Sequence, residues 1–245
     1  MEQLFTFIAK IFRYDPTVDD APYYTTHEVS IADDGTGIVT ALQVLHAINF
    51  EQEAIGYDHN CSSGLCGRCS MMIDGAPALA CWKPLEPGEH TFEPLPGFPV
   101  IKDLIVDRSS ARQQFINVDN SIKTVDPIVT LKDIDYDLYW ETLERLNMCR
   151  ECMQCYVVCP AVKTSRRFAG PGAMAQIAQR VLDGEDQSDR IGQAVFYGLW
   201  DCDLCGACMS VCPSGIKHVD LFSLMQAAAA ERGLVPAENS EKSFM

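Results

Sequence analysis

Twelve of the 245 residues are cysteines, and all twelve fall into three short groups. Cysteine thiolates bind soft metals, and they also form disulfides. Disulfide frameworks are typical of short secreted chains, whereas this chain is long. Its first ten residues, MEQLFTFIAK, contain Glu2 and only a short apolar run, unlike a secretory signal. Metal binding is therefore the first hypothesis, and the spacing of the cysteines indicates which metal.

The first group consists of Cys61, Cys66 and Cys69, followed by Cys81 after eleven intervening residues. This is the spacing of plant-type ferredoxins, in which four thiolates hold a [2Fe–2S] cluster. Small residues, among them Gly64 and Gly67, keep the loop compact, so that backbone N–H groups can approach the sulfur atoms. The sequence predicts a two-iron cluster here.

The second and third groups repeat one pattern, CxxCxxCxxxCP, which is the bacterial ferredoxin pattern. In proteins with two such runs, the fourth cysteine of each run binds the cluster of the other run. We therefore expect one [4Fe–4S] cluster on Cys149, Cys152, Cys155 and Cys212. A second is expected on Cys159, Cys202, Cys205 and Cys208.

Zinc and disulfides remain alternatives for the same sulfur atoms. Zinc modules favour two separated CxxC pairs over four cysteines in eleven residues that end in proline. Disulfides are disfavoured by the spacing and by the length of the chain.

The composition excludes other classes of protein. With 19 basic and 34 acidic residues the formal charge is −15, which disfavours binding to nucleic acid. Hydrophobic residues make up 47% and charged residues 22%, as in globular proteins. The longest uncharged stretch, residues 35–50, is too short and too polar to cross a bilayer.

The elements around the first group alternate between strand and helix patterns. Bulky strand formers fill residues 5–14 and 23–32, and a helical period begins after the N-cap residue Thr40 and continues to Ala54. Strands are expected over residues 70–73 and 76–82, joined by a turn at Asp74 and Gly75. From about Val100 onward the pattern is mostly helical, with apolar stripes that place helices over the ranges 135–147, 171–182, 191–199 and 219–232.

We therefore predict an α+β protein with two domains. Residues 1–103 form a plant-type [2Fe–2S] ferredoxin domain, and residues 104–245 form an all-α, bacterial-ferredoxin-like domain that binds two cubane-type clusters. The sequence contains no nucleotide-binding glycine motif and no catalytic set of carboxylates or nucleophile and base. No catalytic residue is assigned, and substrate chemistry is expected on another chain.

The order of these two domains resembles the iron–sulfur subunits of succinate dehydrogenase and fumarate reductase. The similarity includes Phe12–Pro16 (FRYDP), Leu79–Cys81 (LAC) and Pro94–Asp107 (PLPGFPVIKDLIVD), and it extends from about residue 4 to about residue 230. The resemblance implies a β-grasp fold for the first domain.

The resemblance also implies partners. A flavoprotein subunit would carry covalent FAD and interconvert succinate and fumarate. A membrane anchor, often with haem b, would complete a site for menaquinone or another quinone. The chain itself would then be a peripheral membrane protein, by default on the cytoplasmic side of the cell membrane.

Two features depart from the family. Most members lack a cysteine equivalent to Cys205 and hold a [3Fe–4S] third cluster, whereas the complete run here favours [4Fe–4S]; a three-iron cluster without Cys205 is the alternative. After Cys159-Pro160 the chain has AVKTSRR in place of the family's aromatic residues, including a tryptophan that helps to bind quinone. A thiol-linked, heterodisulfide-reductase-like fumarate reductase and a free-standing multi-cluster electron carrier therefore remain alternative functions.

Overall fold

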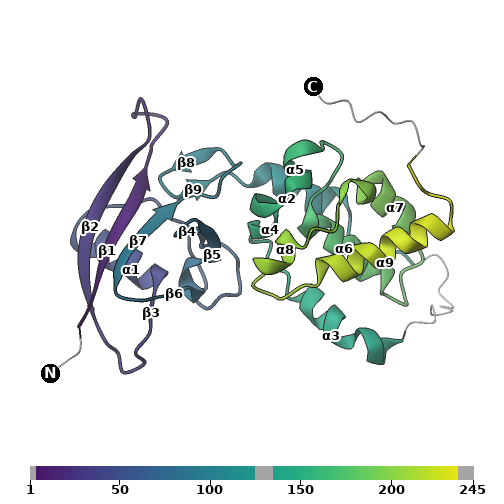
Figure 1. Cartoon of the computed structure of the whole chain (residues 1–245), viewed down its shortest axis with the longest axis horizontal. Coiled ribbons are helices and arrows are strands. Elements are labelled where there is room, and N and C mark those ends of the chain that lie inside the picture. Colours follow the sequence, from purple (N-terminus) through teal and green to yellow (C-terminus); the bar gives the residue numbers. More distant parts are fainter. Residues whose placement is uncertain (1–3, 125–134, 237–245) are drawn as a thin grey trace. The chain divides into compact units, whose positions relative to one another are not determined.

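The structure is a computed structural model that describes residues 4–124 and 135–236. It contains two compact units (Figure 1). The first unit comprises residues up to Ser110 together with Arg150–Val157, and the second comprises Ala111–Cys149 and the chain from Val158 onward. The first unit is thus completed by a segment from the second half of the sequence.

A five-stranded sheet forms the framework of the first unit. Its strand order is β2-β1-β7-β4-β5, with β1 parallel to β7 and the other neighbours antiparallel. The strands of this sheet are β1 (Leu4–Arg13), β2 (Tyr23–Ala32), β4 (Ser70–Ile73), β5 (Ala76–Leu79) and β7 (Gly88–Glu93). A separate two-stranded sheet pairs β3 (Val39–Thr40) with β6 (Pro84–Leu85). The expected strand over residues 76–82 ends at Leu79, because Ala80–Trp82 forms a 3₁₀ turn, η1.

The core of this unit lies between the sheet and one helix, α1 (Ala41–Glu51). Strand β1 buries alternate residues, Phe7, Ala9 and Ile11, as the two-residue period of a strand requires. The helix buries Leu45 and Ile48 against the same core. It begins at the predicted N-cap, where Thr40 and Gln43 form a reciprocal capping box. The first domain therefore has the expected mixed fold.

A short hairpin of β8 (Val100–Lys102) and β9 (Ile105–Val106) corrects the helical pattern predicted from Val100. Asp103 makes the turn with φ of 49°. Its carboxylate accepts hydrogen bonds from Arg13 Nε (3.1 Å) and from the backbone N–H of Gly56 (2.8 Å). These partners are distant in sequence, so no local pattern could have predicted the hairpin.

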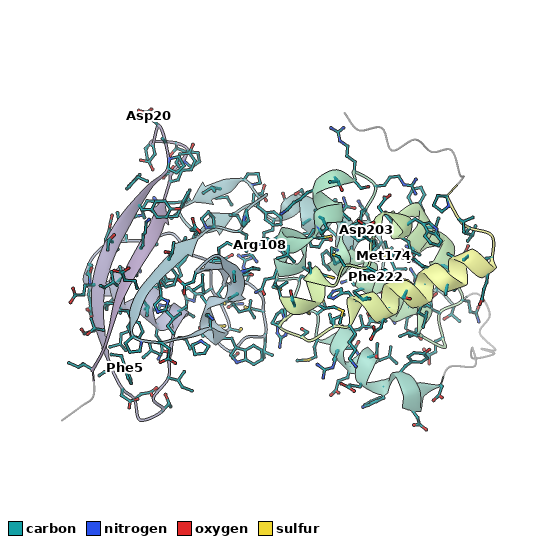
Figure 2. All side chains as sticks on the ribbon, viewed as in Figure 1. Phe5, Asp20, Arg108, Met174, Asp203 and Phe222 are labelled. Atoms are coloured by element: carbon teal, nitrogen blue, oxygen red, sulfur yellow. The ribbon has the colours of Figure 1, made fainter. Side chains whose placement is uncertain are left out.

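The second unit is helical, as predicted. Its helices are α2 (Ser109–Asn117), α3 (Tyr136–Asn147), α5 (Pro160–Thr164), α6 (Pro171–Val181), α7 (Arg190–Phe196), η2 (Leu199–Asp201), α8 (Ala207–Ser210) and α9 (His218–Glu231). A further helix, α4 (Gln154–Val158), lies almost wholly in the segment that completes the first unit. Met174 of α6 and Phe222 of α9 are buried together with Ile177 and Met225 in the interior of this unit (Figure 2).

A buried ion pair ties α7 to the preceding loop. Asp186 and Arg190 are almost fully buried, and Arg190 Nη2 lies 2.7 Å from Asp186 Oδ2. Arg190 also donates to the carbonyl oxygens of Asp119 and Ser121, and thereby holds the segment after α2. None of the helices in the described ranges has both the length and the apolar character that crossing a membrane requires.

Candidate metal centres

The loop from Cys61 to Cys69 connects α1 with β4, and its backbone conformation is unusual. Ser62, Gly64 and Gly67 have φ angles of 53°, 74° and 69°. Successive residues of alternating handedness turn their N–H groups toward a common point, as in anion-binding nests. The loop is therefore built to surround negative charge with backbone donors.

Cys61 receives most of these donors. Its sulfur accepts hydrogen bonds from the N–H groups of Ser63 (3.4 Å), Leu65 (3.3 Å) and Cys66 (3.3 Å). The bonds from Ser63, followed by those from Cys66, lower the pKa of Cys61 to about 6. A thiol in this state is a thiolate at neutral pH, which is the form that binds metal.

Two other sulfur atoms of this group lie deeper than that of Cys61. Cys69 and Cys81 are buried, and their sulfur atoms are 3.3 Å apart, well beyond the length of a disulfide bond. Gly64 N–H donates to Cys81 Sγ at 3.2 Å, so the loop is hydrogen-bonded to the cysteine of the 3₁₀ turn η1. Burial raises the pKa of Cys69 to about 12. Backbone N–H groups donate to three of the four sulfur atoms, those of Cys61, Cys69 and Cys81. This set fits a [2Fe–2S] cluster, which would supply the negative charge that the donors balance.

Trp82 covers the loop, and sequence reasoning did not single it out. A Cβ atom at Gly64 would lie 2.6 Å from Trp82 Cδ2, so only glycine fits there. Arg150 places its guanidinium 5.1 Å from the centre of the Trp82 ring, a cation–π distance. No pattern in the sequence links Trp82 with Arg150, because they meet only through the fold of the first unit.

Four thiols of the second unit are also gathered. Cys159 precedes α5, Cys202 follows η2, Cys208 lies on α8, and Cys205 is exposed between them. Burial raises the pKa of Cys159, Cys202 and Cys208, that of Cys208 to about 12, and the neighbouring Cys205 raises each of them further. Thiols that affect one another in this way lie close together, which fits the donor set of a cubane cluster.

The remaining four cysteines are divided between the units. Cys152 and Cys155 belong to the first unit, where Cys152 is part of the hydrophobic core, and Cys149 and Cys212 belong to the second. Cys212 Sγ accepts a hydrogen bond from Ile216 N–H at 3.4 Å. All twelve cysteines are free thiols. Within the two described ranges, no three His, Cys, Asp or Glu side chains are grouped so that they could hold a single metal ion.

Two families of iron–sulfur proteins match this chain. A family described as a 2Fe-2S iron-sulfur cluster binding domain matches residues 8–113, and one described as a 4Fe-4S dicluster domain matches residues 145–216. Fold and site thus define the class, which is that of multi-cluster iron–sulfur proteins.

Similar proteins narrow the class to one family. The fumarate reductase iron-sulfur subunit of Escherichia coli is 30% identical over 96% of this chain and 93% of its own length. A chain of the Mycobacterium smegmatis Sdh1 complex superposes with a TM-score of 0.82 at 26% identity, covering 96% of this chain and 99% of that chain. The chain belongs to the family of iron–sulfur subunits of fumarate reductase and succinate dehydrogenase.

Some relatives are longer. A subunit of the fumarate reductase (CoM/CoB) of Methanothermobacter marburgensis is 30% identical over 95% of this chain. An iron–sulfur protein of Methanocaldococcus jannaschii is 36% identical over 80% of it. The chain spans only 46% and 40% of the length of these two relatives.

Proposed function

We propose that this chain is the electron-transfer subunit of a fumarate reductase or succinate dehydrogenase complex. It would relay electrons between a flavoprotein with covalent FAD and a membrane quinone or quinol pool. The observation that carries the proposal is the pair of thiol sets, one in each unit, on a chain of this family. Bound clusters would supply one-electron carriers, and this chain holds and insulates them.

The proposal assigns all twelve cysteines. Residues 1–103 would contain all ligands of the two-iron cluster, and residues 104–245 would contain the ligands of both cubanes, with Cys152 and Cys155 on the segment that completes the first unit. The proposed ligands are Cys61, Cys66, Cys69 and Cys81 for [2Fe–2S], Cys149, Cys152, Cys155 and Cys212 for one [4Fe–4S], and Cys159, Cys202, Cys205 and Cys208 for the other. The proximity of Cys205 to Cys159, Cys202 and Cys208 supports four irons at the last position.

The fourth thiolate can be tested directly. Cys205→Ser should lower the iron content and convert the third cluster to a three-iron centre with its own electron paramagnetic resonance (EPR) signal, since one iron loses its ligand. Because Cys205 is exposed, the substitution should leave the fold of the helical unit intact. A four-iron spectrum with unchanged iron content would exclude Cys205 as a ligand.

The quinone assignment needs the complex with its partners. We would purify the native complex through this chain and measure fumarate reduction driven by a menaquinol analogue. Turnover with the quinol is the expected result and would make the segment after Cys159-Pro160 a candidate quinone site. Lys163, Arg166 and Arg167 of this segment are exposed.

A thiol-linked fumarate reductase is the second candidate function. It is supported by the complete third cysteine run and by the similarity to a relative whose name specifies CoM/CoB. Turnover with thiols but not with quinol would replace the quinone assignment by this one. Dye-driven turnover alone would favour a carrier role.

A further inference from the structure

Arg108 holds the backbone of the two-iron loop. It lies directly before α2 (Figure 2), and its side chain binds the segment from Gly67 to Ser70. Its Nη1 donates to Gly67 O at 3.0 Å, and its Nη2 donates to Arg68 O at 2.9 Å and to Ser70 O at 3.0 Å. One guanidinium thus fixes three carbonyl oxygens on either side of Cys69.

These bonds also orient the peptide N–H groups of the loop. In a trans peptide the C=O of one residue and the N–H of the next point in opposite directions. Holding the carbonyls of Gly67, Arg68 and Ser70 toward Arg108 therefore directs the following N–H groups away from it. The fork of the guanidinium suits this task, since an ammonium group has no planar array of donors.

Arg108 also places a positive charge beside thiols of two cysteine groups. Burial and the nearby charge of Arg68 lower the pKa of Arg108, while Asp58, Cys152 and Cys69 raise it. A guanidinium remains protonated even so. The side chain therefore presents a permanent charge to one thiol of the two-iron group and one thiol of the second group.

The close approach of the two groups is visible at Gly67. A Cβ atom there would lie 2.4 Å from the carbonyl oxygen of Arg150 and 3.1 Å from Cys152 Cα, both atoms of the segment that completes the first unit. Arg108 bonds to the carbonyl of this same glycine. Gly67 therefore contacts the segment of the second cysteine group and also binds the charged guanidinium of Arg108.

We propose that Arg108 is a positioning residue for electron transfer, which fixes the two-iron loop through three carbonyl oxygens and raises the reduction potential of its cluster by placing a cation beside Cys69. The inference rests on the proposed ligation of the two-iron cluster. A fixed positive charge stabilises the reduced state, which carries one more negative charge than the oxidised state.

The test separates charge from hydrogen bonding with three variants of the complete complex. Arg108→Met removes both, Arg108→Lys keeps the charge without the fork, and Lys83→Met removes an exposed charge two residues after Cys81 as the matched control. The midpoint potential is followed by EPR-monitored redox titration, and loop stability by the rate of iron loss to a chelator.

We expect Arg108→Met to lower the equilibrium constant for reduction of the two-iron cluster about tenfold. This corresponds to a midpoint potential lower by about 59 mV for one electron. Arg108→Lys should keep the potential but lose iron faster, and Lys83→Met should change neither. An Arg108→Met complex that retains its two-iron cluster with an unchanged midpoint potential would overturn the inference. An equal shift of the midpoint potential in Lys83→Met would overturn it as well.

If Arg108→Met fails to hold its two-iron cluster, Arg108→Lys provides the test. Iron loss from Arg108→Lys at the same rate as from the unmodified complex would contradict the positioning role. Absence of a two-iron signal from the unmodified complex would instead refute the ligation proposal itself.

Discussion

The two thiol sets that the structure gathers achieve different electrostatics with the same donor atom. In the first unit, backbone N–H groups converge on Cys61 and lower its pKa to about 6. In the second unit, burial and neighbouring thiols raise the pKa of Cys208 to about 12. Cys61 is thus prepared for negative charge before metal binds, whereas Cys208, like the buried Cys69 of the first set, acquires a stable thiolate only with the metal. The first set thus combines backbone N–H donors with burial, whereas burial is the main influence on the thiols of the second set.

The largest effect that the comparison predicts is loss of one centre without the others. Cys66→Ser should abolish the two-iron EPR signal and leave the cubane signals, because none of the proposed ligands of either cubane lies on the loop from Cys61 to Cys69. Iron analysis combined with EPR of the purified chain measures both. Loss of all three centres would show that the second unit depends on the first cluster, and the comparison would then fail.

The reactivity of the individual thiols should differ with their pKa values. In the folded chain freed of iron, Cys61 should react with iodoacetamide at pH 7 at least tenfold faster than Cys69 or Cys208, since only a thiolate is the nucleophile. Its rate should fall as the pH drops below about 6. Alkylation at each site is followed by mass spectrometry, with the denatured chain as the control. Equal rates in the folded chain would contradict the role assigned to the N–H donors.

The stability of the second unit depends on a buried ion pair. Asp186→Asn should lower the free energy of unfolding by about 3–5 kcal/mol, because it leaves Arg190 charged and buried without its carboxylate. Burial alone would raise the pKa of Asp186, but hydrogen bonds from Arg190 and Ser188 lower it.

Asp189→Asn is the matched control for the ion pair. Asp189 pairs with Arg232 at the surface and caps α7, and asparagine caps equally well, so the cost should be at most about 1 kcal/mol. Denaturation of both variants measures the difference. Equal costs would show that burial of the pair does not matter.

The smallest predicted effect concerns pH. His218 is buried, and burial lowers its pKa to about 4. The unfolded chain takes up this proton near pH 6.5 and the folded chain only near pH 4, so stability should fall as the pH decreases across this window. His218→Phe should remove about 1–3 kcal/mol of that dependence, measured by denaturation at several pH values. An unchanged slope would show that His218 is not the group responsible.

The sequence predicted those features that depend on local pattern. Strand β2 and the N-cap Thr40 were predicted at the residues where the structure has them, because alternation and capping are local properties. The family and its type of fold were likewise predicted from the cysteine spacing and from short motifs.

The features that were missed depend on contacts between distant residues. The hairpin at Asp103 is fixed by Arg13 and Gly56, and the carbonyl oxygens that Arg108 binds lie about 40 residues earlier. Arg150–Val157 belongs to the first unit, where Arg150 and Cys152 approach Gly67 closely. None of these contacts has a signature in the residues that surround them in sequence.

The most direct test of the account is the metal content of the unmodified chain, purified without oxygen. We predict about ten iron atoms and about as many acid-labile sulfides per chain, with one EPR signal from a two-iron centre and signals from two cubanes. Zinc in place of iron, or iron without sulfide, would contradict the central claim that this chain holds three electron-transfer clusters.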